Sequence, residues 1–118
     1  PVAGAGVQAL VVGQSPLFNA ERERLAALTL EHRLPAIAGT GDGHFARAGG
    51  LMNFGADIGA SWHRSASFVH RILNGARPAT LPVEVVRKFH LVINRGTAAA
   101  LGLKVPPHLV ALADEVVG

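Results

Sequence analysis

The sequence predicts an α/β fold in which a parallel sheet is flanked by helices. Three short apolar runs, at residues 9–12, 35–38 and 51–54, predict strands, and the first is continuously apolar, as expected for a strand that is buried on both faces. A helical stretch at 19–33 separates the first two runs, and a glycine-rich loop at 39–50 separates the second from the third. This order is typical of a parallel sheet. We therefore expect the three strands to be parallel neighbours with the helix packed on one face.

The composition bounds the class of protein. The chain has 118 residues, of which 49% are apolar and 16% charged, which indicates a folded chain with one modest core. Its formal net charge is +3, but the basic residues are dispersed and the only aromatic residues are five Phe and one Trp. A nucleic-acid surface usually combines a basic stripe with stacking aromatics, so no nucleic-acid partner is expected. The sequence has no cysteine for disulfides or thiolate chemistry.

Local signals place the ends of the next elements. The helix at 19–33 has a predicted N-cap, acids in its first turn and basic residues in its last, which are Asn19, then Glu21 and Glu23, then His32 and Arg33. The 39–50 loop is expected to contain one helical turn near 45–47. Gly55 is expected to end the third strand.

The longest predicted helix runs from Asp57 to Asn74. Asp57 is its expected N-cap and Gly75 follows its end, which is the usual distribution of capping residues. Apolar residues recur at spacings of three and four and form one stripe, made of Ile58, Trp62, Ala66, Val69, Ile72 and Leu73. A stripe of this size is costly to expose, so we expect another element or another chain to cover it.

The last part of the chain continues the alternation. After a proline-containing loop at 76–82, residues 88–93 predict a strand. Its more solvent-exposed face is expected to carry Lys88, His90 and Val92. Thr97 is expected to cap a short helix that Gly102 ends. One or two further helical turns are expected within 108–117.

Seven motifs, in order along the chain, are similar to successive segments of one protein family. They are ALVV with SPLFN (9–19), RLPAI (33–37), AGGLMNFG (48–55), ILNGARP (72–78), LPVE (81–84), KFHLVIN (88–94) and ALGL (100–103). By these motifs the chain resembles the ABC-transporter substrate-binding family related to the tryptophan and tyrosine uptake proteins. No single motif is diagnostic, but seven in register cover nearly the whole chain.

The resemblance implies a type I periplasmic-binding fold, with two flavodoxin-like lobes, a hinge and a small ligand between the lobes. It also implies that this chain is a fragment, the C-terminal third of a longer protein; Gly4 or Gly6, expected as the C′ glycine of a preceding helix, agrees with a start inside a βα repeat. Residues 1–55 would then be a βαβ segment of the ligand-binding lobe. Residues 56–84 would be a helix crossing toward the other lobe with a linker, and 85–118 a return strand with C-terminal helices.

The chain departs from the family pattern at three positions. Ala38, Phe54 and His90 stand where members usually have an aromatic residue, Tyr and Glu, respectively. The chain has no Tyr, so a phenol that could hydrogen-bond a ligand is absent. The preference of the family for aromatic amino acids is therefore not carried over to this sequence.

Candidate ligand-binding residues follow from the strand ends. Ligands of open α/β sheets bind outside the carboxyl ends of the strands. That rule selects Ser15 with Asn19 after the first strand, Thr40 after the second, and Asn53 with Phe54 at the third. Ser15 and the N–H groups at the start of the Asn19 helix could receive a carboxylate, and Phe54 could supply an apolar wall. The alternative is ordinary turn and capping chemistry at Ser15 and Asn19.

Other residue patterns do not indicate a catalytic or metal site. His63 and His70 share one helical face, but two histidines are too few for a zinc site. Asp42 beside His44 suggests acid–base work only weakly, and the glycine-rich loops lack the context of a nucleotide site. We therefore expect no catalytic residue, no metal and no cofactor.

The sequence thus predicts a periplasmic solute-binding component of an ABC importer that is not an enzyme. It would capture a small molecule, an amino acid or a related carboxylate, and its partner would be an ABC permease in the membrane. The fragment alone is expected to form a homodimer through the stripe of the long helix, unless that helix folds back onto its own sheet. The alternative function is a free-standing flavodoxin-like regulatory or enzyme domain.

Overall fold

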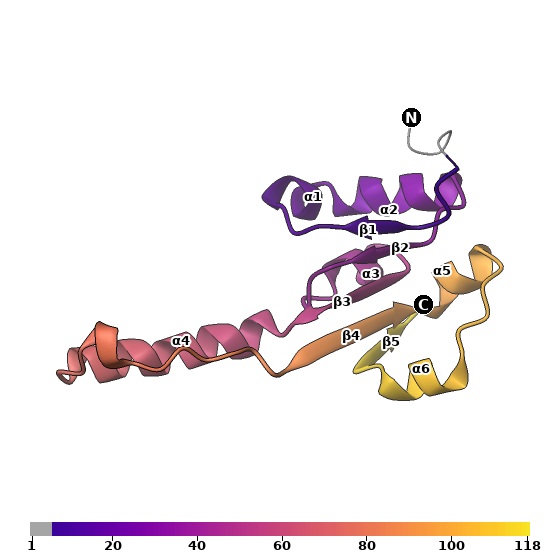
Figure 1. The fold of residues 1–118 in the computed structure, drawn as a ribbon. Coiled ribbons are helices and arrows are strands. Elements are labelled where there is room, and N and C mark those ends of the chain that lie inside the picture. Colours follow the sequence, from indigo (N-terminus) through magenta and orange to yellow (C-terminus); the bar gives the residue numbers. More distant parts are fainter. Residues whose placement is uncertain (1–5) are drawn as a thin grey trace.

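The computed structural model describes residues 6–118, and its centre is a five-stranded sheet in the order β1-β2-β3-β4-β5 (Figure 1). The strands are β1 (Leu10–Val12), β2 (Ala36–Ala38), β3 (Met52–Ala56), β4 (Phe89–Asn94) and β5 (Glu115–Val117). β1, β2 and β3 are parallel neighbours, β4 is antiparallel to β3, and β5 is parallel to β4. The predicted α/β fold and the predicted parallel pairing of the first three strands are both confirmed.

The helix expected at 19–33 is two helices, α1 (Pro16–Ala20) and α2 (Arg22–Glu31). The prediction that Asn19 is an N-cap is wrong, because Asn19 lies inside α1 and Ser15 occupies the cap position. Proline fits the first helical position, where its missing N–H costs no hydrogen bond, so the helix begins at Pro16.

The core lies on one face of β1 and β2. Ala26 of α2 and Phe45 of α3 (His44–Arg47) pack there on Ala36 and Ala38. The helical turn expected near 45–47 is therefore confirmed. Burial of β1 on both faces is not observed, since Val11 on the opposite face is 80% exposed.

Two expectations for the third and fourth strands are wrong. β3 does not end at Gly55 but continues to Ala56, because Gly55 is paired with His90 across the ladder to β4. Val92 does not lie on a wet face. It is fully buried, and a Cβ built on Gly43, just before α3, would lie 3.0 Å from its Cγ2.

The predicted long helix is confirmed as α4 (Ile58–Leu73). The Asp57 side chain accepts a hydrogen bond from the Ala60 N–H at 2.9 Å, and Gly75 adopts a φ of 95° beyond the end. α4 extends away from the sheet and residues 76–88 return beside it (Figure 1), through a 3-10 helix η2 (Pro78–Thr80). No residue of α4 is buried, and Trp62 is 73% exposed, so the alternative that the helix folds back onto its own sheet is wrong.

The C-terminal part contains α5 (Arg95–Ala100) and α6 (Pro107–Leu112). Asn94, not Thr97, caps α5, since its Oδ1 accepts from the Thr97 N–H at 2.9 Å. Residues 115–117 form β5 rather than the expected end of a helix. Asp114 starts this pairing, because its N–H donates to the Leu91 carbonyl and its carboxylate accepts from the Leu91 N–H.

Of the two glycines predicted to follow a helix, Gly4 lies outside the described residues, and Gly6 adopts a φ of 70°, a left-handed conformation that favours glycine. Within residues 6–118, no helix combines the length and the apolar character that crossing a membrane requires.

We predict that Asp57→Ala unwinds the first turn of α4 while the sheet stays folded, because α4 has few other contacts to hold it. Amide exchange at residues 60–64 should become severalfold faster, with exchange in β2 and β3 unchanged. Ser65→Ala is the control, since Ser65 only donates back to the Ser61 carbonyl within the helix. Equal loss of protection in the sheet would contradict the independence of α4.

The same cap should be lost in acid. The hydrogen bond from Ala60 and then the interaction with Lys88 lower the pKa of Asp57 from its ordinary value of 3.8. A carboxyl group with a lowered pKa stabilises the fold above its unfolded pKa, and that stabilisation disappears as the pH falls through the folded pKa. Carboxyl NMR titration of Asp57 should give a midpoint below 3.8, together with faster exchange at Ala60; a midpoint above that value would contradict the cap.

Candidate functional site

A pocket of about 600 Å³ lies outside the carboxyl ends of β1 and β2. Strand residues Val12 and Ala38 form its floor, and the segments that leave the two strands form its walls. The remaining lining residues are Gly13, Gln14, Ser15, Pro16, Phe18, Asn19, Arg22, Leu25, Thr40, Asp42, Phe45 and Ile58. The pocket therefore occupies the position in which open α/β sheets bind ligands.

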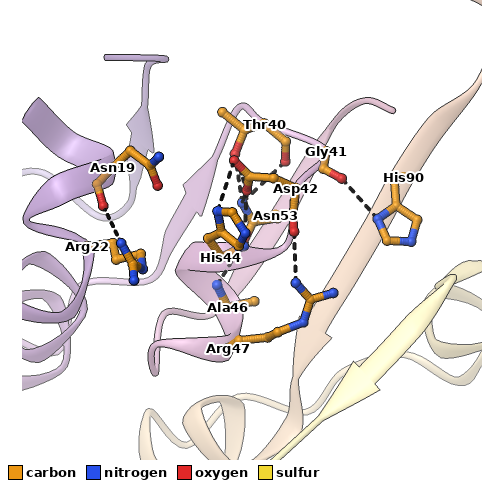
Figure 2. Close-up of polar contacts among 10 residues, drawn as sticks. All are labelled: Asn19, Arg22, Thr40, Gly41, Asp42, His44, Ala46, Arg47, Asn53 and His90. Atoms are coloured by element: carbon orange, nitrogen blue, oxygen red, sulfur yellow. Dashed lines mark hydrogen bonds and ion pairs between the residues drawn. The ribbon is translucent and has the colours of Figure 1, made fainter. Parts of the chain in front are cut away.

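The first wall follows β1. Ser15 is half-buried at the N-cap position of α1, and its hydroxyl makes no capping hydrogen bond. Asn19 is exposed one turn later, and its carbonyl accepts a hydrogen bond from Arg22 Nη1 at 2.9 Å (Figure 2). α1 has only five residues and begins with a proline, so its backbone offers a weaker anion site than the sequence suggested.

The second wall is the loop after β2, and hydrogen bonds fix its shape (Figure 2). Asp42 Oδ1 accepts from the Thr40 hydroxyl at 3.0 Å and from the His44 N–H at 3.0 Å. Arg47 Nη1 donates to the Asp42 carbonyl at 2.9 Å, and Arg47 also forms an ion pair with Glu115, which lowers the pKa of that carboxyl. Thr40 and Asp42 therefore present fixed polar groups to the pocket.

Asn53 lies behind this wall and does not line the pocket. Its side chain is fully buried, with Oδ1 accepting from the Ala46 N–H at 2.7 Å. Its Nδ2 donates to the Thr40 hydroxyl at 2.9 Å and to the Thr40 carbonyl at 3.2 Å. Asn53 thus holds the loop in place from below, because a buried amide is stable only when its donors and acceptors are paired.

Phe54 lies outside the pocket as well. Successive strand residues point to opposite faces, so Phe54 points away from the side on which Asn53 contacts α3. Its ring stacks on Phe89, with the ring centroids 5.6 Å apart. Of the five residues expected to bind ligand, the structure therefore brings together Ser15, Asn19 and Thr40, places Asn53 beneath the loop and leaves Phe54 elsewhere.

Two charged residues in the pocket were not selected from the sequence. Arg22 lies on the first wall, is half-buried and forms no ion pair with any acid among residues 6–118. Asp42 lies on the second wall. Strand-end reasoning missed Arg22 because it lies at the start of α2, with the whole of α1 between it and the end of β1. It also belongs to a run of alternating charges that largely cancel one another.

The predicted histidine pair and a second hollow lie outside this pocket. Residues 6–118 contain no group of three or more potential metal-ligating side chains. His63 and His70 both lie on the exposed surface of α4. A second hollow, of about 770 Å³, lies between α4 and residues 83–88, where Arg64 pairs with Glu84 and Lys88 pairs with Asp57.

Comparisons with known proteins agree with this architecture. A family model described as ABC transporter substrate binding protein matches residues 5–117. A conserved domain protein from Vibrio cholerae O1 biovar El Tor is 22% identical with a TM-score of 0.84, over 98% of this chain and 38% of that chain. An ABC domain in complex with L-Trp from Streptococcus pneumoniae gives the same identity and TM-score, over 98% of this chain and 39% of that chain.

A third similar structure was solved without a ligand. The ligand-free, open structure of a substrate-binding protein with adhesive properties from Clostridium difficile is 20% identical with a TM-score of 0.65, over 92% of this chain and 36% of that chain. No curated protein matches the chain. The chain thus shares the fold of these structures and spans somewhat more than a third of their length.

We predict that Asn53→Leu lowers the free energy of unfolding by about 2–3 kcal/mol, because it leaves the Ala46 N–H and the Thr40 groups without their buried partner. Urea denaturation measures this. Ser15→Ala should change stability by less than about 0.5 kcal/mol, since the Ser15 hydroxyl makes no capping bond. Equal stability of the two variants would show that Asn53 does not support the wall.

Proposed function

The chain belongs to the ABC transporter substrate-binding protein family, and we propose that it forms one side of the small-molecule site of such a protein. The observation that carries the proposal is the pocket at the carboxyl ends of β1 and β2, which the polar residues Ser15, Asn19 and Thr40 help to line. Binding is non-covalent and no bond is made or broken. The protein would deliver its ligand to an ABC permease from the periplasmic side of the membrane.

We propose an amino acid or a related carboxylate as the ligand. Arg22 and Asp42 lie on different walls of one pocket and are not paired with each other, so they can bind opposite charges of one molecule. Asp42 would do so beside His44, whose Nδ1 lies 3.6 Å from Asp42 Oδ2. The apolar lining, made by Phe18, Leu25 and Phe45, suits an apolar side chain. The L-Trp complex of the streptococcal relative makes tryptophan the first compound to test.

The ligand would be held by two lobes that close on it. Residues 1–55 would contribute all the described lining residues of the pocket except Ile58, 56–84 would cross toward the second lobe, and 85–118 would return to the sheet. The course of α4, which leaves the sheet after β3 and returns through β4, supports this division (Figure 1). A free-standing regulatory or enzyme domain is less well supported, because such a domain would bury one face of its longest helix, and α4 buries none of its residues.

We expect the 118-residue chain to bind L-tryptophan at best weakly, and the product of the whole reading frame to bind it with closure. Calorimetry on both measures this, with L-leucine and L-tyrosine as further probes. Micromolar binding by the 118-residue chain alone would mean that the site is not shared between lobes. Absence of binding by the longer product to any amino acid would contradict the ligand class.

Arg22→Met should weaken binding of the tightest amino acid about tenfold or more, because a hydrogen bond to a charged group is lost. Arg24→Met is the matched control, since Arg24 lies on the same helix but does not line the pocket. The decarboxylated analogue of that amino acid, tryptamine in the case of tryptophan, should bind equally to Arg22→Met and to the unchanged protein. An equal loss of affinity for both compounds would show that Arg22 does not bind the carboxylate.

We further propose that the 118-residue chain alone associates as a two-fold dimer through the apolar stripe of α4, where Trp62 and Leu73 are 73% and 80% exposed. Sedimentation at low micromolar concentration should give a dimer. Val69→Glu should dissociate it, whereas His70→Glu, on the polar face, should not. A monomer under these conditions would refute the dimer.

A further inference from the structure

The wall of the pocket that follows β2 lies directly against the backbone of β3. A Cβ built on Gly41 would lie 2.2 Å from the Ala56 carbonyl oxygen, and one built on Gly55 would lie 2.8 Å from Thr40 Cα. No side chain fits between these two backbones. Glycine at both positions is therefore what allows the loop from Thr40 to Asp42 to cross β3 at this point.

His90 fastens this crossing from the neighbouring strand. It stands opposite Gly55 in the β3–β4 ladder, and because Gly55 has no side chain, the ring can reach over it to the loop. His90 Nδ1 lies 3.0 Å from the Gly41 carbonyl oxygen, a contact between residues 49 positions apart (Figure 2). A carbonyl oxygen only accepts hydrogen bonds, so Nδ1 must carry the proton in this contact.

The Gly41 carbonyl lies between the two pocket residues of the loop, Thr40 and Asp42. Two other side chains hold the same loop. Asn53 donates a hydrogen bond to the Thr40 carbonyl, and Arg47 donates one to the Asp42 carbonyl. His90 contacts the loop from β4, the strand through which the chain returns to the sheet after α4. The contact therefore joins the wall of the pocket to the connection between the sheet and α4.

We propose that His90 is a positioning residue, which acts through the Gly41 carbonyl to hold Thr40 and Asp42 in the pocket. It touches no ligand itself and does not line the pocket. The proposal rests on the proposed function only in treating the pocket as a ligand site. The contact itself can be tested without any ligand.

The test compares His90→Leu, which removes the donor, with His90→Asn, whose Nδ2 can take the place of the ring Nδ1. Amide exchange at residues 40–43 should become about tenfold faster in the Leu variant and return close to the original rate in the Asn variant. Exchange in β1 and α2 should not change in either. Phe89→Leu is the matched control, because Phe89 precedes His90 on the same strand and contacts Phe54 instead.

The ring nitrogens of the unchanged protein provide a second readout that does not depend on the folding of a variant. Nitrogen NMR should show a proton on Nδ1 of His90. A proton on Nε2 alone, or unchanged exchange at 40–43 in His90→Leu, would overturn the proposal. In the product of the whole reading frame, His90→Leu should weaken L-tryptophan binding and His90→Asn should restore it. If neither the unchanged protein nor the variants bind any amino acid, the proposed function fails. The exchange data then still decide the role of His90.

Discussion

The buried amide of Asn53 joins three elements, namely β3, α3 and the loop after β2, since it bonds to Ala46 of α3 and to both oxygens of Thr40 in the loop. An amide with no exposed surface has to find these partners, because an unpaired polar group in the core costs more than most single contacts contribute. The position of α3 and the shape of the loop before it therefore follow from β3. The same hydrogen bonds therefore fix the second wall of the pocket, which is the loop after β2.

Around that constraint the chain divides into two parts with different sources of stability. The sheet, α2 and α3 share an apolar core of small residues with Phe45. α4 and its return segment have no such core. They are held by an N-cap, by two exposed ion pairs and by contacts of two arginines with the Phe68 ring. Exposed ion pairs contribute little. The apolar stripe of α4 is the reason to expect a second lobe or a second chain against it, which is also what closure on a ligand requires.

Elements with strong local signals could be predicted from the sequence. The α4 helix was placed correctly because Asp57, the apolar stripe and Gly75 all agree, and β1 to β3 because short apolar runs separated by one helix favour parallel pairing. The wrong expectations for the third and fourth strands come from tertiary effects. The packing of α3 buries Val92, and the ladder to β4 carries β3 past Gly55. For the site, the strand-end rule found Ser15, Asn19 and Thr40. It could not tell that Asn53 faces α3 and that Phe54 faces the opposite side of the sheet. It also could not tell that the start of α2 brings Arg22 back to the pocket.

The central claim is that a ligand binds at the carboxyl ends of β1 and β2 and not in the hollow beside α4. Chemical-shift mapping of backbone amides during titration of the 118-residue chain with L-tryptophan tests it most directly, because weak binding in fast exchange is still visible residue by residue. The shifts should gather at Ser15, Asn19, Thr40 and Asp42. Shifts gathered instead at Ser61, Phe68 and Val85, which line the second hollow, would contradict the account.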